Sequence, residues 1–243
     1  MRLSLKAGAF IVAPILLVSL VIYIFIPGIF TYIKVKHDYE NIDRTIPAFE
    51  KVSVPEDFEE YSFSDVVFSA PAGLVNTVKN GSGNVASYRN DDITITISDF
   101  SSLNLSDYYD PWEALEYDKE DYRHFFDTVG HEFPSQNGRP LIWFEKDALN
   151  AKMCLHLRSK DLKVFRELAK NKEEAWKIED TWKLNGKGFT GYAGHLLDNS
   201  DVFAGMWSYT LIPDYNPYQD IYFTIQNTDD TTAKQIASSI RLK

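Results

Sequence analysis

Residues 85–98 read VASYRNDDITITIS, and this stretch gives the clearest indication of how the chain folds. Isoleucine alternates with a hydroxyl residue from Ile93 to Ser98, which is the period-two pattern of a strand with one buried face. Asn90 and the two aspartates after it are typical turn residues between two such runs. The stretch therefore predicts an antiparallel β-hairpin.

Further strand-like runs lie on both sides of this hairpin. They cover residues 63–70, 141–145, 151–157, 186–197, 202–212 and 220–226. The links between neighbouring runs are too short for parallel crossover connections, so the pairing should be antiparallel. We expect an α+β fold, in which one antiparallel sheet of about six or seven strands carries packed helices.

Three helices are predicted among these strands. The first begins at Asp110, because Asp110-Pro-Trp-Glu combines an N-cap, a proline at the first helical position and a glutamate at N3. It ends at Gly130, since glycine readily adopts the left-handed conformation that stops a helix. Ser159 begins the second helix, which ends between residues 170 and 178. The third helix follows Asp229 or Asp230 near the end of the chain.

Three parts of the sequence resemble Mog1/PsbP-like domains in the order of their elements. They are the opening Phe68-Ser-Ala-Pro-Ala-Gly, the meander over 202–212 and 221–226, and the closing run 229–240. The resemblance covers residues 61–243. Members of that fold serve as photosystem extrinsic subunits, transport cofactors and bacterial envelope lipoproteins, so it implies a domain that binds partners. This chain lacks the lipidated cysteine of many envelope members, because its single cysteine is Cys154.

The N-terminal region contains an uncharged stretch, Ala7–Ile33, which follows a short basic N-terminus over residues 1–6. About 20 apolar residues in a helix span a bilayer core, so this stretch predicts an uncleaved transmembrane anchor. A cleaved signal peptide is the alternative, but it would have a shorter apolar run and a small-x-small cleavage site. Positive charges on the two sides nearly balance. An N-terminal anchor before a large domain favours an extracytoplasmic domain, and a cytosolic domain is the alternative.

Residues 34–60 are charged and poor in apolar side chains, which predicts a stalk between the anchor and one globular domain over 61–243. All 35 acidic residues follow residue 37, and the formal net charge of the chain is −10. Such a domain lacks the basic surface that nucleic acid requires, and it is unsuited to lie flat on an anionic membrane. We expect a single-pass protein of the cell envelope with no nucleic-acid partner.

Two charged segments and one aromatic loop are candidate binding surfaces. Residues 107–132 contain nine acidic side chains against two basic ones, which predicts either an acidic docking face for a basic protein or an ordinary solvated face. Residues 152–172 contain seven basic side chains against two acidic ones, which favours compensation within the fold or plain solvation. Tyrosines in the loop after residue 213 suit partner binding, although a well-made turn explains them equally. The candidate partner-binding residues are Glu113, Glu116, Glu120, Asp121, Asp214, Tyr215 and Tyr218.

The sequence contains no motif that predicts catalysis, a cofactor or a metal site. It has no Gly-x-Ser-x-Gly, no P-loop and no dinucleotide fingerprint, and its five histidines lack zinc-motif spacing. The leading hypothesis is a non-enzymatic, membrane-anchored domain that binds another protein. One specific version is an immunity protein that neutralises a toxin. The alternative is a small-ligand-binding or sensing domain, and an enzyme comes third.

Overall fold

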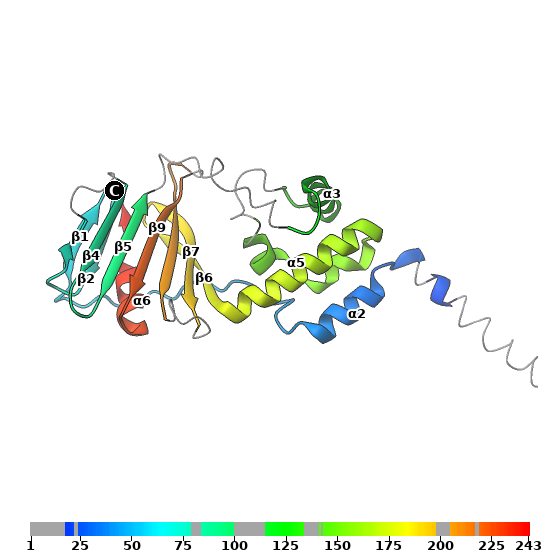
Figure 1. The fold of residues 1–243 in the computed structure, drawn as a ribbon, viewed down its shortest axis with the longest axis horizontal. Coiled ribbons are helices and arrows are strands. Elements are labelled where there is room, and N and C mark those ends of the chain that lie inside the picture. Colours follow the sequence, from blue (N-terminus) through cyan, green and yellow to red (C-terminus); the bar gives the residue numbers. More distant parts are fainter. Residues whose placement is uncertain are drawn as a thin grey trace, which may run out of the picture. The chain divides into compact units, whose positions relative to one another are not determined.

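The structure is a computed structural model of the chain, and it describes residues 18–21, 24–78, 84–99, 115–133, 141, 143–197, 205–216 and 219–243. The chain divides into two compact units (Figure 1). The helical unit contains residues 1–45 and 110–175, and the sheet unit contains residues 46–109 and 176–243. The sequence predicts one globular domain over 61–243 and gives no indication of this division.

The sheet unit contains a seven-stranded antiparallel sheet with the strand order β3-β4-β5-β9-β8-β7-β6. Its strands are β3 (Val75–Asn76), β4 (Val85–Arg89), β5 (Thr94–Asp99), β6 (Glu179–Gly186), β7 (Phe189–Leu196), β8 (Trp207–Pro213) and β9 (Ile221–Gln226). The predicted hairpin is β4–β5, in which Ala86 pairs with Ile97 and Tyr88 pairs with Ile95. The predicted α+β class and its antiparallel sheet are confirmed.

A second, three-stranded antiparallel sheet has the order β1-β2-β10. Its strands are β1 (Glu59–Phe63), β2 (Val66–Ala70) and β10 (Arg241–Leu242). The sequence predicts a single strand over 63–70, whereas the structure has a tight hairpin there in which Ser64 has a φ of 51°. The predicted C-terminal helix is α6 (Asp230–Ser239), and Asp229 caps it by accepting a hydrogen bond from the backbone N–H of Thr232 at 3.0 Å.

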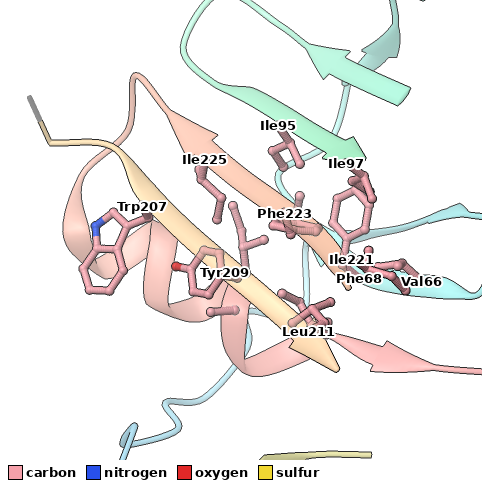
Figure 2. Packing of buried hydrophobic residues seen from close by; sticks show 14 of the residues in the cluster. Val66, Phe68, Ile95, Ile97, Trp207, Tyr209, Leu211, Ile221, Phe223 and Ile225 are labelled. Carbon is pink, nitrogen blue, oxygen red and sulfur yellow. The ribbon is translucent and has the colours of Figure 1, made fainter. Parts of the chain in front are cut away.

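The core of the sheet unit lies on one face of the seven-stranded sheet, against α6 and β2 (Figure 2). Trp207, Tyr209 and Leu211 are buried on β8, and the residues between them are half-buried, as period-two alternation requires. The ring of Phe223 on β9 lies 5.1 Å from the ring of Phe68 on β2, measured between centroids. The two sheets therefore share one apolar core.

The helical unit contains most of the helices. They are α2 (Ile29–Asp38), α3 (Lys119–Val129), a π-helical turn η3 (Phe144–Ala148), a 3-10 helix η4 (Ala151–His156) and α5 (Ser159–Ile178). The predicted second helix is confirmed as α5. The first predicted helix corresponds to α3, which begins at Lys119 rather than at Asp110. The predicted capping box over 110–113 lies outside the described residues, and Gly130 ends the helix as predicted, with a φ of 73°.

The predicted hairpin between residues 141 and 157 is wrong, because this segment is helical. The Asn150 side chain accepts a hydrogen bond from the backbone N–H of Lys152 at 3.1 Å, which caps η4. The Asp43 carboxylate accepts another from the N–H of Ala151 at 2.8 Å. These two side chains stabilise a helical start. The buried apolar residues of the segment are Leu141, Phe144, Leu149, Ala151, Cys154 and Leu157.

The helix α2 is packed against η4 through its N-terminal end. The backbone N–H of Gly28 donates to the carbonyl oxygen of Leu155 at 3.0 Å. A Cβ on Gly28 would overlap the carbonyl oxygen of Cys154, so only glycine permits this approach. Thr31 and Val35 are buried on the same side of α2. The last residues of the predicted anchor therefore belong to the folded helical unit.

The range predicted as a stalk also contributes to the folded units. Val35 and Ile42 are buried in the helical unit, and Ile46 is buried in the sheet unit. Residues 34–60 contain few apolar side chains, but these three pack in the cores of the two units. In the described part of the chain, none of the helices combines the length and the apolar character that crossing a membrane requires.

Candidate ligand-binding groove

A groove of about 290 Å³ lies in the helical unit between α2, α5 and the segment that precedes α3. From α2 and the residue after it come Thr31, Lys34, Val35, Asp38 and Tyr39. From α5 come Lys163, Arg166, Glu167 and Lys170, and from the third segment come Glu116 and Tyr117. This volume is close to the lower end of the range for small-molecule sites in proteins.

The groove has charges of both signs in its lining. Lys163, Arg166 and Lys170 are three and four residues apart on α5, so they share one face of that helix. Lys34 adds a cation from α2, whereas Asp38, Glu116 and Glu167 add carboxylates. Paired anionic and cationic groups suit a polar ligand that itself has both charges.

Arg166 links the two helices that form the groove. Its Nη2 donates a hydrogen bond to the Oγ1 of Thr31 at 2.7 Å, and Thr31 is buried in α2. A guanidinium has five N–H donors in a planar fork, so this one bond leaves donors for a ligand. The bond orients the side chain before any ligand arrives, which lowers the entropy that binding would cost.

Glu167 is held by donors on both of its carboxylate oxygens. One oxygen accepts from the backbone N–H of Glu116 at 2.8 Å, and the other accepts a hydrogen bond from the hydroxyl of Tyr122. Burial raises the pKa of Tyr122 well above its usual value, and the bond to Glu167 raises it further. The phenol therefore remains a donor at any physiological pH, and it fixes the position of the carboxylate.

A second carboxyl group, that of Glu145 on η3, is buried in the helical unit. Burial is the main reason that its pKa is raised to about 8, and the nearby charge of Glu167 adds to this. The amide of Asn171 donates to it at 3.4 Å and acts in the opposite direction. Glu145 is thus mostly protonated at pH 7 in the folded protein, whereas an exposed glutamate is ionised there.

Lys172 is one of two buried lysines among the described residues of the same unit, the other being Lys146. Its Nζ donates to the carbonyl oxygen of Leu149 at 2.6 Å, and its pKa is lowered to about 8 because burial disfavours the charged form. The carboxylates of Asp43 and Asp147 partly offset this by raising the pKa. Glu145 and Lys172 therefore both titrate close to physiological pH.

The acidic residues predicted to bind a partner have different environments. Glu116 lines the groove. Glu120 accepts from Arg123 of the same helix at 2.7 Å, and Asp121 pairs with Lys160 of α5 at 2.5 Å. Glu113 lies outside the described residues. The pair between Asp121 and Lys160 confirms that the basic segment compensates part of the acidic helix within the fold.

The predicted aromatic loop belongs to the sheet unit and is not part of the groove. Tyr215 is 58% exposed, and its hydroxyl donates to a carboxylate oxygen of Asp65 at 3.0 Å. The backbone N–H of Asp214 donates to Gly188, which stabilises the turn. Tyr218 lies outside the described residues. The structure thus places the five described residues of the predicted set in two different units.

Within the described residues, three histidines have carboxylate partners, and none of them lines the groove. His37 lies 2.9 Å from Asp38, its neighbour in the sequence, and its side chain is exposed. His124 lies 2.8 Å from Asp161, whose hydrogen bond raises the pKa of the imidazole, and the His124 side chain is largely exposed on α3. His195 lies 3.5 Å from Asp230 and stacks on Trp207 at 4.6 Å. In the ranges that the structure describes, no three His, Cys, Asp or Glu side chains gather closely enough to hold a metal ion.

Comparison with known proteins adds no family to this description. No protein-family model matches the chain, and no curated protein matches its sequence significantly.

Most of the groove residues are not among those predicted from the sequence. The sequence shows a basic segment over 152–172, but it does not predict that any residue of this segment forms a site. The spacing of Lys163, Arg166 and Lys170 on one helix face is a usable signal. The contribution of α2 has no such signal, because its first residues fall in the predicted anchor.

Proposed function

We propose that this protein is a membrane-anchored domain of the cell envelope that binds a small polar ligand in the groove of the helical unit. The observation that carries the proposal is the mixed charge of this groove, in which Arg166 and Glu167 are each held in position by neighbouring side chains or backbone. The role is binding or sensing rather than catalysis.

The anchor in this proposal is the uncharged run over residues 7–26. Its length matches the roughly 20 residues that span a bilayer core. The residues after it are packed on η4, so the span ends before Pro27 and Gly28 rather than at Ile33. The folded part then lies on the extracytoplasmic side of a single-pass protein.

The ligand that fits the groove has an anionic group and a cationic group on one small framework, as an amino acid has. Its carboxylate or phosphate would bind the guanidinium of Arg166, with Lys163 and Lys170 beside it. Its ammonium would bind the carboxylates of Glu167 and Asp38. The lone pairs of Glu167 that its two present donors leave unused are available for this contact.

Calorimetric titration of the full chain in lipid nanodiscs tests this proposal. The ligands are a set of amino acids, and each is paired with a monocarboxylate and an amine of similar size. We expect the zwitterion to bind at least about tenfold more tightly than either singly charged relative, because only it can use both halves of the lining. Equal affinity for all three would contradict the proposal.

Substitutions in the groove locate the binding. Arg166→Gln should weaken binding about 10-fold to 100-fold, the usual effect of losing a charge-assisted hydrogen bond. Lys170→Gln should weaken it less, and it leaves the bond between Arg166 and Thr31 intact. Arg89→Gln, at an exposed position on β4, is the matched control and should leave affinity unchanged. A loss of binding in the control would show that the ligand binds elsewhere.

A second candidate is a protein-interaction domain, of which a toxin-neutralising immunity protein is one version. It is favoured by the outer face of α3, where Glu120 and Asp127 are exposed while Tyr122 and Phe126 hold the helix on the core. Capture of a basic partner by the full chain, and its loss in Glu120→Lys, would support this candidate. A fragment that begins at residue 45 is unsuitable for the test, because it lacks α2.

A further inference from the structure

The outward face of α2 is apolar in its first half. Phe30 and Ile33 point away from the buried side of the helix and are 73% and 58% exposed. The exposed face becomes polar further along, at Lys34, Lys36 and His37. A folded unit rarely exposes neighbouring large apolar side chains unless another surface covers them.

The same apolar exposure continues toward the N-terminus. Ile24 and Phe25, just before α2, are 50% and 69% exposed. In the described part of the chain, seven of the eleven exposed large hydrophobic residues lie between residues 18 and 33. In the sequence, these residues belong to the uncharged run that begins at Ala7.

The helix cannot turn this face inward. Gly28, Thr31 and Val35 hold the opposite side of α2 on the helical unit, and the contact between Gly28 and the η4 backbone is too close to permit rotation. Phe30 and Ile33 therefore stay directed outward while the unit is folded.

Basic side chains flank the apolar face. Arg158, which is exposed immediately before α5, donates from Nη2 to the backbone oxygen of Ile24 at 3.5 Å. Lys34 lies one residue after Ile33. Apolar side chains beside cations are the composition of a helix that lies in the membrane interface, where anionic headgroups contact the cations.

We propose that the helical unit rests on the lipid surface, with Phe30 and Ile33 in the interfacial region and Lys34 and Arg158 at anionic headgroups. The inference rests on the proposed anchoring by residues 7–26, because that span delivers α2 to the membrane surface. The sequence disfavours such contact through its net charge of −10, but the surface beside the anchor is locally basic. The unit is thus seated on the bilayer rather than held away from it by a stalk.

Fluorescence quenching in nanodiscs tests the seating of the unit. The full chain carries Cys154→Ala and one new cysteine for an environment-sensitive dye, at Ile33 or, as the control, at Glu120, whose side chain is 74% exposed on α3. The lipids carry a nitroxide either near the headgroup or near the bilayer centre. We expect the headgroup nitroxide to quench the dye at Ile33 at least about threefold more than the dye at Glu120, and more than the central nitroxide does.

Each other outcome overturns the inference in a different way. Equally weak quenching at Ile33 and Glu120 places the helical unit away from the lipid, whether in water or against a protein. Stronger quenching at Ile33 by the central nitroxide places this residue inside the span. A chain that does not enter nanodiscs overturns the proposed anchor itself, and with it this inference.

A charge-reversal variant tests the headgroup contacts. In nanodiscs of anionic lipid, Lys34→Glu combined with Arg158→Glu should lower the quenching at Ile33 by about half, since attraction becomes repulsion. Lys51→Glu, an exposed lysine of the sheet unit, is the control and should have no effect. Unchanged quenching in the double variant would overturn the role of the two cations.

Discussion

The sheet unit and the helical unit bury different kinds of side chain. In the sheet unit, the buried polar residues among those described are uncharged, namely Thr181 and Gln219. The helical unit buries five residues with ionisable side chains within the described ranges. They are Glu145, Lys146, Asp161, Lys172 and Glu173. One chain therefore combines a core that is almost entirely apolar with a core that also contains hydrogen-bonded ionisable groups.

The difference has an energetic consequence. Burying a large apolar side chain stabilises a fold by about 1.5–3 kcal/mol, whereas burying an ionised group costs free energy unless partners compensate it. The helical unit should therefore be the less stable of the two and the more sensitive to pH. Four substitutions test this contrast, in decreasing order of the change that we expect.

Phe223→Ala should cause the greatest loss, about 4 kcal/mol of unfolding free energy, because it removes a buried ring at the centre of the sheet-unit core. Hydrogen exchange, read separately for the two units, measures the change. The sheet unit should lose protection, whereas Thr224→Ala on the half-buried face should change it by less than about 1 kcal/mol. A small effect of Phe223→Ala would remove the contrast between the two cores.

Glu145→Gln should remove a pH dependence of the helical unit. In the wild type, the folded pKa of Glu145 is about 8 and the reference pKa is 4.5. The folded state therefore holds the proton more tightly, and stability falls as pH rises between these values. From pH 4.5 to pH 7 the loss amounts to about 3 kcal/mol. A glutamine side chain cannot ionise, and its carbonyl can still accept from Asn171, so the variant should lack this loss.

Urea unfolding at several pH values between 4.5 and 7.5 measures the effect of Glu145. Staying below pH 8 avoids the opposite trend from Lys172, whose lowered pKa makes stability rise with pH between about 8 and 10.5. Glu174→Gln, at an exposed carboxylate of α5, is the control and should follow the wild type. If the unfolding free energy of Glu145→Gln changed with pH as steeply as that of the wild type, Glu145 would not be the source of the pH dependence.

Gly28→Ala should destabilise the helical unit by about 2 kcal/mol, because the new methyl group overlaps the backbone of Cys154. Limited proteolysis of α2 reports its release from η4. Gly73→Ala in the sheet unit gives the comparison, since Gly73 has a φ of 84° but no atom near the added methyl group. Its cost, about 1 kcal/mol, reflects backbone strain alone. If Gly28→Ala cost no more unfolding free energy than Gly73→Ala, the close contact at Gly28 would be contradicted.

Tyr215→Phe should have the least effect, about 0.5 kcal/mol, because the hydrogen bond to Asp65 is exposed to water. Thermal unfolding of the sheet unit measures it. A loss of more than about 2 kcal/mol would show that the aromatic loop is a structural part of that unit rather than a peripheral turn.

Most of the sheet unit can be predicted from the sequence, because alternation and turn residues act over a few positions. The hairpin β4–β5 and the strand β9 follow from such local patterns. Strand β6 has no such pattern, because its sequence, EDTWKLNG, contains few apolar residues, and only Thr181 and Leu184 in it are fully buried. Strand β6 is defined instead by its pairing with β7 along its whole length. The resemblance to Mog1/PsbP-like domains stays a prediction.

The helical unit is harder to predict because its local signals are ambiguous. The run Met153-Cys-Leu-His-Leu alternates like a strand, but Asn150 and the distant Asp43 stabilise helical turns there. The groove joins segments near residues 31–39, 116–117 and 163–170. Side-chain spacing indicates the face of α5, but no local rule indicates that α2 and Glu116 meet it. Such convergence depends on tertiary packing.

The pairing of β5 with β9 has a consequence for the order in which the protein is assembled. Thr94 pairs with Gln226, so a ribosome must add more than a hundred residues after β5 before its second neighbour exists. At the usual rate of synthesis this takes on the order of ten seconds. The segments of the helical unit are complete by residue 175, well before β9 emerges. During that interval Ile95 and Ile97 have no partner strand on that side, so β5 presents an unpaired strand edge until β9 is made.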